Sequence, residues 1–495
     1  MNAAGILIAA GADARIAIEC GERKLSYGEL RGAVGHAAGA WRQLGLREDE
    51  RVLVFAPDGI AWVIAYLGAI AAGGVAVGLN SRLFDKELAI ILAESGARFI
   101  CCEAGSLELL DRLCAQLEHP PRILVMDGEA SEWRRLLGMA PVLPPVPRQP
   151  EDMAFWIYTS GTTGRPKAVI HAQRSVDACA AVAQQVLGVT ANDRLYASSK
   201  LFFAYSLGNS LLAGLRLGAT VILDGEWPTA ERVAAICEQH HPTVLFSVPT
   251  LYHKIIQAGL AQRLKASGVR HFVSAGETLP ASVRRALEEA SGISPLSGYG
   301  TSETLCLMLY SRDDNGILRP TPLTEVRNCD AFSEDETGMP RRLCVRHPSV
   351  ALGYWQRPDA QADFHDGWFS PGDMFVPCEG EALAWEYSGR TDDMLKISGQ
   401  WVSTIAVDQA LLAACGDSVQ ELGSVALKNA EGLTEIAVFV VPAAGRSADA
   451  QARLAEGIAA LPGFKRPRRI RYVEGLPRTA TGKLQRNKLA EMSLE

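Results

Sequence analysis

Short apolar runs alternate with longer Ala-, Leu- and charge-rich stretches along most of the chain. Six such runs are RVLVFAP, ARFICCE, PRILVMD, ATVILD, TVLFSVP and RHFVSAGE. Two parallel strands need a long crossover connection, which is usually a helix that covers one face of their sheet. The alternation therefore predicts an α/β fold built from parallel sheets.

A chain of 495 residues is longer than one hydrophobic core usually serves, so at least two domains are expected. After residue 395 the pattern restarts with a helix over 405–415, two strands over 424–429 and 435–443, and a helix over 449–460. This order is typical of a small α+β module. The Pro-rich stretch 137–150 is expected to connect subdomains of the larger N-terminal part.

Charge and cysteine usage narrow the class of partner. The 49 Lys and Arg residues against 56 Asp and Glu residues give a net charge of −7, which argues against a nucleic-acid or anionic-lipid partner. The 11 Cys residues form no CxxC pair, so neither a zinc site nor a disulfide framework is expected. The N-terminus lacks a basic region followed by a long apolar run. We therefore expect a cytoplasmic protein with free thiols that acts on small molecules.

One uncharged segment, Gly59–Leu79, has the length of a membrane span. The pair Gly73-Gly74 divides it into an Ala-rich part and the short run GVAVGL. This division is typical of a buried helix that leads into a buried parallel strand. We therefore expect no association with a membrane.

The stretch YTSGTTGRPKAVIH, residues 158–171, combines hydroxyl side chains and glycines with Lys167. Such a loop offers backbone and hydroxyl donors to a polyphosphate, and a lysine adds a mobile positive charge. The Walker motif requires Lys directly after Gly and then Ser or Thr, whereas Arg165 and Pro166 precede Lys167 here. Phosphate binding of another type is indicated, although a lone loop of this composition is also typical of an ordinary turn.

The same stretch resembles the phosphate loop of the acyl-adenylate-forming (AMP-binding) superfamily. Further segments match that family in the expected order, namely SAGETLP, GYGTSE, DGWFSPGD, GRTDDMLKISG and PRTATGKLQR. The resemblance covers nearly the whole chain. It implies a large N-terminal domain over 1–391 that holds the ATP and acyl pockets, and a small mobile C-terminal domain over 392–495 with its hinge at Asp392.

The resemblance also implies roles in nucleotide binding. The residues expected to contact ATP or AMP are Thr159, Ser160, Gly161, Thr162, Thr163, Gly164, Lys167, Gly276, Glu277, Tyr299, Gly300, Thr301, Asp373 and Arg390. Ser302 is expected to contact the α-phosphate and Glu303 to hold Mg²⁺, while Lys483 stabilises the charge that develops as the carboxylate attacks phosphorus. Without the motif, Glu303 would be read as a solvated helix-start acid, Asp373 as a turn residue and Lys483 as a surface lysine.

The run SSKLFFAYSLGN, which begins at Ser198, resembles the acyl pocket of benzoate- and hydroxybenzoate-CoA ligases and of their anthranilate-activating relatives. In amino-acid-activating domains an Asp at this place holds the ammonium group, whereas this chain has Ala204. Phe203, Ala204 and Tyr205 are therefore expected to wall a flat apolar slot for an aromatic ring. Cys306 stands where benzoate ligases often carry His, which leaves the ring substituents open.

The expected acceptor is CoA. Positions that match the CoA contacts of 4-chlorobenzoate-type ligases are Arg82, Gly399, Phe464, Arg466 and Arg468. A solvated basic patch would explain the arginines equally well in the absence of the resemblance. A carrier-protein thiol is the alternative acceptor, and a homodimer is possible.

Taken together, the resemblance implies an AMP-forming ligase that converts a benzoate, ATP and CoA into aryl-CoA, AMP and pyrophosphate. Aryl-AMP would be the intermediate, and rotation about Asp392 would separate the two half-reactions. One alternative is a stand-alone aryl-acid adenylation enzyme that loads a carrier protein. A nucleotide-binding protein without turnover is the third reading, because residues 401–408 depart from the family pattern.

Overall fold

The computed structural model describes residues 1–128, 131–160, 165–313, 315–329, 340–358, 360–378, 380–381, 383–391, 394–397, 400–429, 434–478 and 484–492. The chain divides into two compact units. The first unit consists of Met1–Val326 and Val345–Pro371, and the second unit consists of Arg327–Cys344 and Gly372–Glu495. Asp392, the expected hinge, lies outside the described residues, so the boundary placed there stays a prediction.

The first unit contains a seven-stranded sheet with the order β18-β8-β7-β4-β3-β5-β6. Its strands are β3 (Arg51–Phe55), β4 (Val75–Gly78), β5 (Phe99–Cys102), β6 (Arg122–Val125), β7 (Met153–Ser160), β8 (Pro166–Ala172) and β18 (Gly353–Tyr354). Strands β6, β5, β3, β4 and β7 are parallel, and β8 and β18 are antiparallel additions at the edge. The helices that follow the early strands are α3 (Ile60–Ala71), α4 (Asp85–Ser95) and α5 (Leu107–Cys114).

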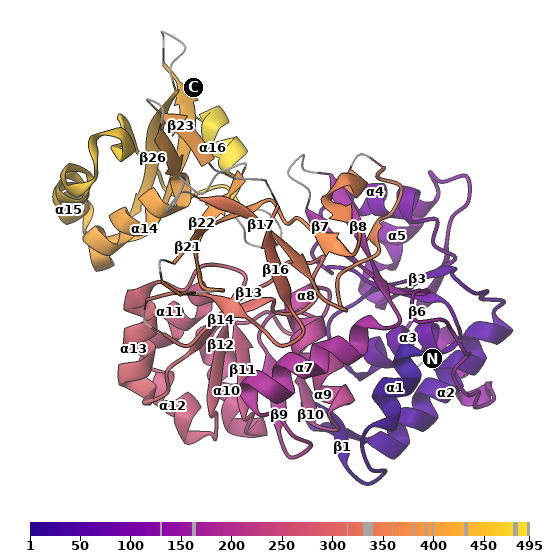
Figure 1. Cartoon of the computed structure of the whole chain (residues 1–495). Coiled ribbons are helices and arrows are strands. Elements are labelled where there is room, and N and C mark those ends of the chain that lie inside the picture. The colour runs from indigo at the N-terminus through magenta and orange to yellow at the C-terminus, as the bar shows by residue number, and fades with distance from the viewer. Residues whose placement is uncertain are drawn as a thin grey trace. The chain divides into compact units, whose positions relative to one another are not determined.

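The first unit also contains a nine-stranded sheet with the order β15-β14-β13-β12-β11-β9-β10-β1-β2. Its strands are β1 (Ile16–Cys20), β2 (Arg23–Ser26), β9 (Arg194–Ala197), β10 (Thr220–Leu223), β11 (Val244–Ser247), β12 (His271–Ser274), β13 (Leu296–Tyr299), β14 (Leu309–Ser311) and β15 (Arg319–Pro320). Helices α7 (Ser175–Leu187), α10 (Ala230–His240), α11 (Pro249–Gln257), α12 (Ala261–Ala266) and α13 (Ala281–Ser291) pack beside it (Figure 1). The predicted α/β class is confirmed.

Parallel pairing places the loops of interest at one end of each sheet. Strand β7 runs parallel to β4 and ends at Ser160, within the stretch 158–171 that is expected to bind phosphate. Strands β12 and β13 are parallel neighbours, and they end at Ser274 and Tyr299. Because ligands of open α/β sheets bind outside the carboxyl ends of the strands, the fold positions these segments for binding.

The uncharged segment 59–79 forms helix α3 and then strand β4, as predicted from its two glycines. Every residue of β4 is buried, and so are most residues of α3. No helix among the residues that the structure describes is long and apolar enough to cross a membrane.

The second unit is built around a three-stranded sheet of β25 (Val419–Lys428), β26 (Thr434–Pro442) and β27 (Arg469–Tyr472). Helices α14 (Thr404–Cys415) and α15 (Ser447–Ala460) confirm the two helices predicted here (Figure 1). Their residues Val407, Leu411 and Leu454 pack with Val438 of β26 in one apolar cluster. Helix α16 (Arg486–Met492) and the hairpin of β23 (Met394–Ile397) and β24 (Gln400–Ser403) belong to the same unit.

Cys329 and Cys344 of the second unit form a disulfide, so the expectation that all thiols are free is wrong for this pair. Strand β16 (Glu325–Asn328) pairs with β17 (Arg341–Arg346), and the Cys329 N–H donates to the carbonyl of Arg342. This pairing brings the two Cα atoms to 5.1 Å. The spacing of the cysteines carried no signal for it, because the contact depends on how two strands pair.

A buried carboxylate in β1, next to the edge strand β2 of the nine-stranded sheet, contacts three basic side chains. The Oε2 atom of Glu19 accepts hydrogen bonds from Arg194 at 2.6 Å and from His240 at 3.0 Å, and Lys24 lies 3.4 Å from Oε1. Burial by itself raises the pKa of Glu19, but the hydrogen bonds from Arg194 and His240 outweigh it and lower the pKa to about 2.

Replacing Glu19 with Gln is expected to reduce the free energy of unfolding by about 3 kcal/mol at pH 7, because Arg194 loses its buried partner. A lowered pKa means that the carboxylate contributes stability above its unfolded value of 4.5 and loses this contribution as the pH falls toward 2. The difference between the parental protein and Glu19→Gln in urea unfolding should therefore shrink below pH 4.5. The exposed neighbour variant Glu22→Gln should stay within about 0.5 kcal/mol. A gap that does not narrow in acid would contradict this account.

Candidate active site

The stretch that is expected to bind phosphate connects β7 and β8, which pair as antiparallel strands. Thr159 pairs with Lys167 and Ser160 with Pro166 across the two strands. The expected contacts Gly161, Thr162, Thr163 and Gly164 lie outside the described residues. Thr159 and Lys167 thus flank the tip of the hairpin from opposite strands.

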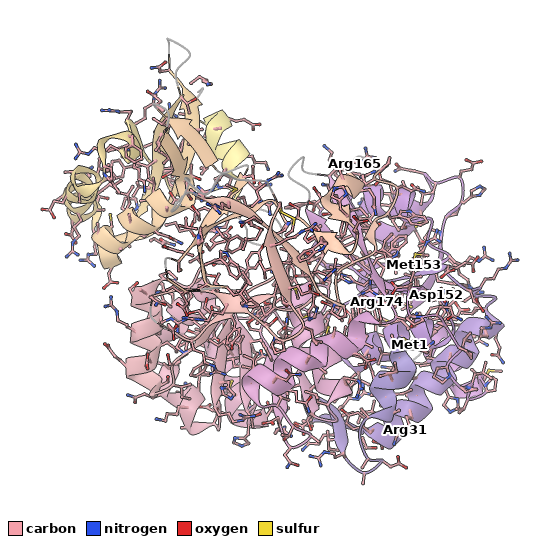
Figure 2. All side chains as sticks on the ribbon, viewed as in Figure 1. Met1, Arg31, Asp152, Met153, Arg165 and Arg174 are labelled. Atoms are coloured by element: carbon pink, nitrogen blue, oxygen red, sulfur yellow. A yellow bond between two sulfur atoms is a disulfide. The ribbon has the colours of Figure 1, made fainter. Side chains whose placement is uncertain are left out.

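Ion pairs hold the start of β8 in place. Arg165, labelled in Figure 2, forms an ion pair with Glu94 of α4. Arg357 contacts the other oxygen of Glu94 at 2.7 Å. The start of β8 is therefore fixed to the helix that packs beside it.

A tight turn after β13 carries the expected metal and α-phosphate residues. The backbone N–H of Thr301 donates to the hydroxyl of Thr304 at 2.9 Å, which closes the turn around Ser302 and Glu303. Gly300 has no room for a side chain, since an added Cβ would lie 2.6 Å from the carbonyl oxygen of Cys306. The turn therefore requires glycine where the family motif has it.

His171 of β8 forms a hydrogen bond with the backbone of this turn. Its Nε2 atom lies 2.9 Å from the carbonyl oxygen of Ser302 and donates to it. Burial lowers the pKa of His171 to about 4, so the imidazole is neutral at pH 7. A neutral buried donor fixes the backbone of Ser302 without adding a charge to the turn.

The residues expected around adenine come from neighbouring strands. Gly276 follows β12 with a φ of +87°, a left-handed conformation that favours glycine. Tyr299 ends β13, which pairs with β12 through Ser274 and Ser297. The structure thus brings the SAGE loop and Tyr299 to the same end of one sheet.

The expected acyl pocket is formed by the segment that opens α8 (Ala204–Ser206) and continues into the π-helix η2 (Leu207–Leu212). Ala204 is buried, while Phe203 and Tyr205 are half-buried. The hydroxyl of Tyr205 donates to the carbonyl of Val273 at 2.9 Å. Asn209 in turn donates from Nδ2 to the carbonyl of Tyr205 at 2.9 Å. Hydrogen bonds at its backbone carbonyl and at its hydroxyl therefore fix the orientation of Tyr205. π-Helical turns such as η2 are frequent at functional sites.

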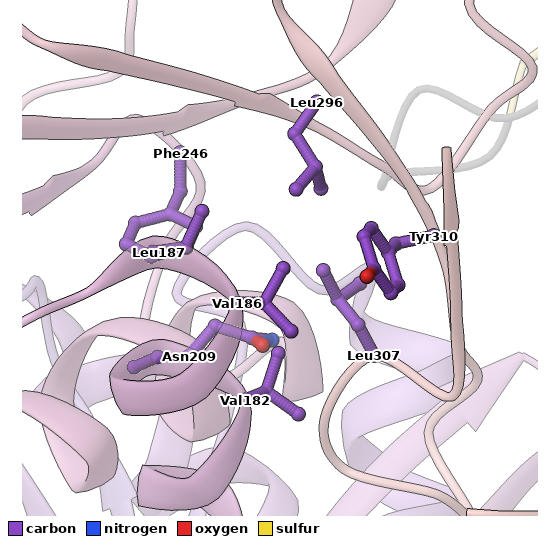
Figure 3. A pocket seen from close by; sticks show the side chains of 9 residues that line it. Val182, Val186, Leu187, Asn209, Phe246, Leu296, Leu307 and Tyr310 are labelled. Atoms are coloured by element: carbon purple, nitrogen blue, oxygen red, sulfur yellow. The ribbon is translucent and has the colours of Figure 1, made fainter. Parts of the chain in front are cut away.

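A narrow apolar cavity adjoins this segment (Figure 3). Its lining consists of Val182, Ala183, Val186, Leu187, Asn209, Phe246, Leu296, Leu307 and Tyr310. Figure 3 shows the carboxamide of Asn209 among the apolar side chains that α7 contributes. Asn209 is the link between the cavity and Tyr205, and the sequence analysis did not single it out.

Cys306 is fully buried, and its Sγ atom lies 3.3 Å from the hydroxyl of Ser349. Ser349 also donates to the carbonyl of Thr304 at 2.6 Å. The thiol therefore contacts a polar cluster behind the Glu303 turn. Its expected contact with the substrate ring stays a prediction.

In the second unit, the two residues expected to hold the ribose face each other across a strand pair. Asp373 of β21 (Asp373–Pro377) pairs with Arg390 of β22 (Trp385–Arg390), and the side chains approach to 3.9 Å. The hydroxyl of Tyr387 donates to Oδ1 of Asp373 at 3.1 Å. Asp373 is thus a buried carboxylate held by a neighbouring hydroxyl, and Tyr387 is a supporting residue that the sequence motifs did not reveal.

The residues expected to contact CoA differ in their surroundings. Arg82 of the first unit is exposed, and its guanidinium lies 4.4 Å from the ring centre of Trp227. Arg466 of the second unit instead donates to the carbonyls of Leu461 and Ala459 at 2.7 and 2.6 Å, at the end of α15. Phe464 packs against the core of its unit, and Arg468 is exposed. For Arg466 and Phe464 the structure therefore reveals stabilising contacts in addition to the expected role.

The model of the family described as AMP-binding enzyme matches residues 8–355 of the chain. This match spans more than half of the sequence and includes the β7–β8 hairpin, the Glu303 turn and the acyl segment. The chain belongs to the AMP-binding enzyme family. The resemblance stated from the motifs is thereby confirmed.

Relatives of this AMP-binding enzyme match it over almost their whole length. A 3-hydroxybenzoate–CoA/4-hydroxybenzoate–CoA ligase of Thauera aromatica is 38% identical, with 99% of this chain and 97% of the relative covered. A 3-hydroxybenzoate–CoA ligase of Aromatoleum sp. (strain CIB) is 37% identical with the same coverage. Among solved structures, a benzoate CoA ligase from Burkholderia xenovorans LB400 has a TM-score of 0.88 at 30% identity, covering 99% of this chain and 100% of that one.

Three expected functional residues of this AMP-binding enzyme, Lys483, Asp392 and Gly399, lie outside the described residues. The chain on either side of Lys483 is nevertheless joined, since Arg478 and Leu484 form an antiparallel bridge. The backbone N–H of Gln485 also donates to the carbonyl of Pro477 at 2.9 Å. The described residues on the two sides of Lys483 are therefore held next to each other.

The carboxylate chemistry around Glu303 suits a loosely held magnesium ion. Within the described part of the chain, no group of three His, Cys, Asp or Glu side chains converges as a metal cage. Mg²⁺ usually keeps several waters and binds through one or two carboxylates together with substrate phosphates. A single half-buried Glu303 near the β7–β8 hairpin fits that mode of binding.

Proposed function

We propose that this AMP-binding enzyme is an ATP-dependent aryl-CoA ligase that acts on benzoate or a substituted benzoate. The observation that carries the proposal is the full-length likeness to hydroxybenzoate-CoA ligases. The buried apolar Ala204 at the expected acyl pocket supports the same class of acid, because an amino acid would leave its ammonium group buried without a carboxylate partner.

In the proposed first half-reaction, a carboxylate oxygen of the acid attacks the α-phosphorus of ATP, and the bond to pyrophosphate breaks. Thr159, Lys167 and the loop 160–164 would hold the β- and γ-phosphates, while Ser302 would contact the α-phosphate. Glu303 would hold Mg²⁺, which neutralises phosphate charge when bound. Lys483 would stabilise the charge that develops on the reacting oxygens.

A further set of residues is proposed to hold the nucleoside. Gly276 and Glu277 would run along the adenine through their backbone, Tyr299 would stack on it, and Gly300 and Thr301 would form the adjoining turn. In the second unit, Asp373 would accept hydrogen bonds from the ribose hydroxyls, with Arg390 beside it. The carboxylate of Asp373 suits this task because an ionised acceptor forms two strong hydrogen bonds to vicinal hydroxyls.

In the proposed second half-reaction, the thiol sulfur of CoA attacks the carbonyl carbon of aryl-AMP, AMP leaves, and the thiol proton is released. Arg82, Gly399, Phe464, Arg466 and Arg468 are proposed to contact CoA. Since Lys483 and most of these residues belong to residues 392–495, rotation about Asp392 would present them in turn. We propose a cytoplasmic location for this chemistry.

A panel assay tests the proposal. Benzoate, its hydroxy- and amino-substituted forms, cinnamate and short fatty acids are each assayed for pyrophosphate release, with CoA and with a phosphopantetheinylated carrier protein. We expect release and thioester formation with benzoates and CoA. Thioester formation only on the carrier protein would favour the stand-alone adenylation enzyme. ATP binding without acid-dependent pyrophosphate release would contradict both the ligase and the adenylation enzyme. Light scattering on the same sample measures whether the protein forms a homodimer.

A further inference from the structure

Tyr354 lies between the two charged side chains that are expected to meet the triphosphate. Its hydroxyl donates to Oε1 of Glu303 at 2.8 Å. Its ring centre lies 5.2 Å from Nζ of Lys167. The ring of Phe364 packs against the Tyr354 ring in a T-shaped arrangement, with 5.4 Å between the ring centres. One half-buried side chain therefore contacts both an acid and a base of the site.

The backbone fixes Tyr354 relative to both partners. Strand β18 pairs with β8, and Tyr354 stands opposite Val169, two residues beyond Lys167. The N–H of Ala351 donates to the carbonyl of Glu303 at 2.8 Å. The segment just before Tyr354 is thus hydrogen-bonded to the Glu303 turn, and Tyr354 itself to the strand of Lys167. All of these contacts lie within the first unit.

Each contact restricts a charged group in a way that favours binding. A hydroxyl that donates to a carboxylate forms a charge-assisted bond, which holds one oxygen and leaves the other free to accept a ligand. The face of an aromatic ring attracts an ammonium group, so the ring limits where the flexible Lys167 side chain can place its charge. A tyrosine that served only to fill space would not need both partners to be charged.

We propose that Tyr354 is a positioning residue for the metal-bound triphosphate, with its hydroxyl orienting Glu303 and its ring orienting Lys167. This inference rests on the proposed function, since it assumes that ATP binds at the hairpin. It separates two effects that belong to one side chain. The hydroxyl acts only when a divalent cation is present, whereas the ring acts through Lys167, whose charge attracts the phosphates with or without the cation.

Calorimetric binding of α,β-methylene-ATP, with Mg²⁺ and with EDTA, tests this division of roles. Tyr354→Phe keeps the ring and is expected to weaken binding about tenfold with Mg²⁺, because a hydrogen bond to a charged group is lost, while binding in EDTA stays within about twofold. Tyr354→Leu removes the ring as well and should weaken binding in both buffers. The control Tyr252→Phe removes a buried hydroxyl of the same unit that donates to the carbonyls of Leu245 and Val273, and its binding should not change.

A double variant distinguishes the loss of the hydrogen bond to Glu303 from a general loss of fold. In the Glu303→Gln background, Tyr354→Phe should cause no additional loss in Mg²⁺ buffer, because the partner of the hydroxyl has changed. An equal loss with Mg²⁺ and EDTA, a full penalty in the Glu303→Gln background, or no loss in any buffer would each overturn the assignment. A parental protein that fails to bind the analogue at all would remove the proposed function and this inference with it, whereas parental binding with an unaffected Tyr354→Phe variant removes the inference alone.

Discussion

Replacing Lys483 with Ala should lower the rate of aryl-adenylate formation by about 100- to 1,000-fold. Thioester formation from supplied aryl-AMP should remain within a few-fold of the parental rate. The reason is that negative charge builds on the carboxylate and α-phosphate oxygens only while the bond to pyrophosphate breaks. In the second half-reaction no bond to phosphorus forms or breaks, because the acyl–oxygen bond of the mixed anhydride is the one that breaks as AMP leaves. A lysine at this place therefore has less charge to stabilise.

The two half-reactions are measured separately, by pyrophosphate release with the acid and ATP, and by thioester formation with chemically prepared aryl-AMP and CoA. Lys488 on α16 provides a matched control, because it is an exposed lysine of the same unit. Lys488→Ala should leave both rates unchanged. An equal loss of both half-reactions in Lys483→Ala would contradict the role given to Lys483, provided that thermal unfolding of the variant matches the parental protein.

Replacing Ala204 with Asp should lower the rate of benzoate adenylation by about 100-fold or more. Ala204 is 7% exposed, so a carboxylate at this position would lose most of its hydration. Burying an unpaired charge costs several kcal/mol, and each 1.4 kcal/mol corresponds to a factor of about ten. If Ala204 faces the substrate as proposed, benzoate would offer only an apolar ring to this position, which cannot compensate for the buried charge.

The uncharged variant Ala204→Asn separates charge from size, because Asn has nearly the shape of Asp. We expect Ala204→Asn to retain much more benzoate activity than Ala204→Asp, with both variants binding α,β-methylene-ATP like the parental protein. Equal losses would mean that only the volume of the new side chain matters. Benzoate turnover that persists unchanged in Ala204→Asp would show that Ala204 does not face the ring.

Several features of this protein could be predicted from local sequence alone. The glycine pair at 73–74 divides α3 from β4, and both elements are buried as predicted. The helices expected over 405–415 and 449–460 are found as α14 and α15, and α15 ends at the residue predicted. The segments expected to bind phosphate and to carry Glu303 were chosen from their residue types, and their roles stay predictions. In each case the signal is local, because strand and helix periodicity and the need for glycine depend on a residue's immediate neighbours.

Other features required the tertiary structure, because they join segments that are distant in the sequence. The hydroxyl of Tyr354 reaches Glu303 because β18 adds to the edge of β8, and no motif marks that addition. The Cys329–Cys344 disulfide depends on the pairing of β16 with β17. Arg466 contacts carbonyls at the end of α15, although its motif suggested only a ligand contact.

The sequence by itself thus determined the fold class, the family and the residue types that this chemistry needs. Tertiary structure decided which side chains support them, such as His171 beneath Ser302 and Tyr387 beside Asp373. The physical reason is that hydrophobic periodicity reports whether a residue is buried, but not which residue it meets. Partners are set by strand register and by the packing of whole elements, and a shift of one residue in register would turn every side chain of a strand to the opposite face.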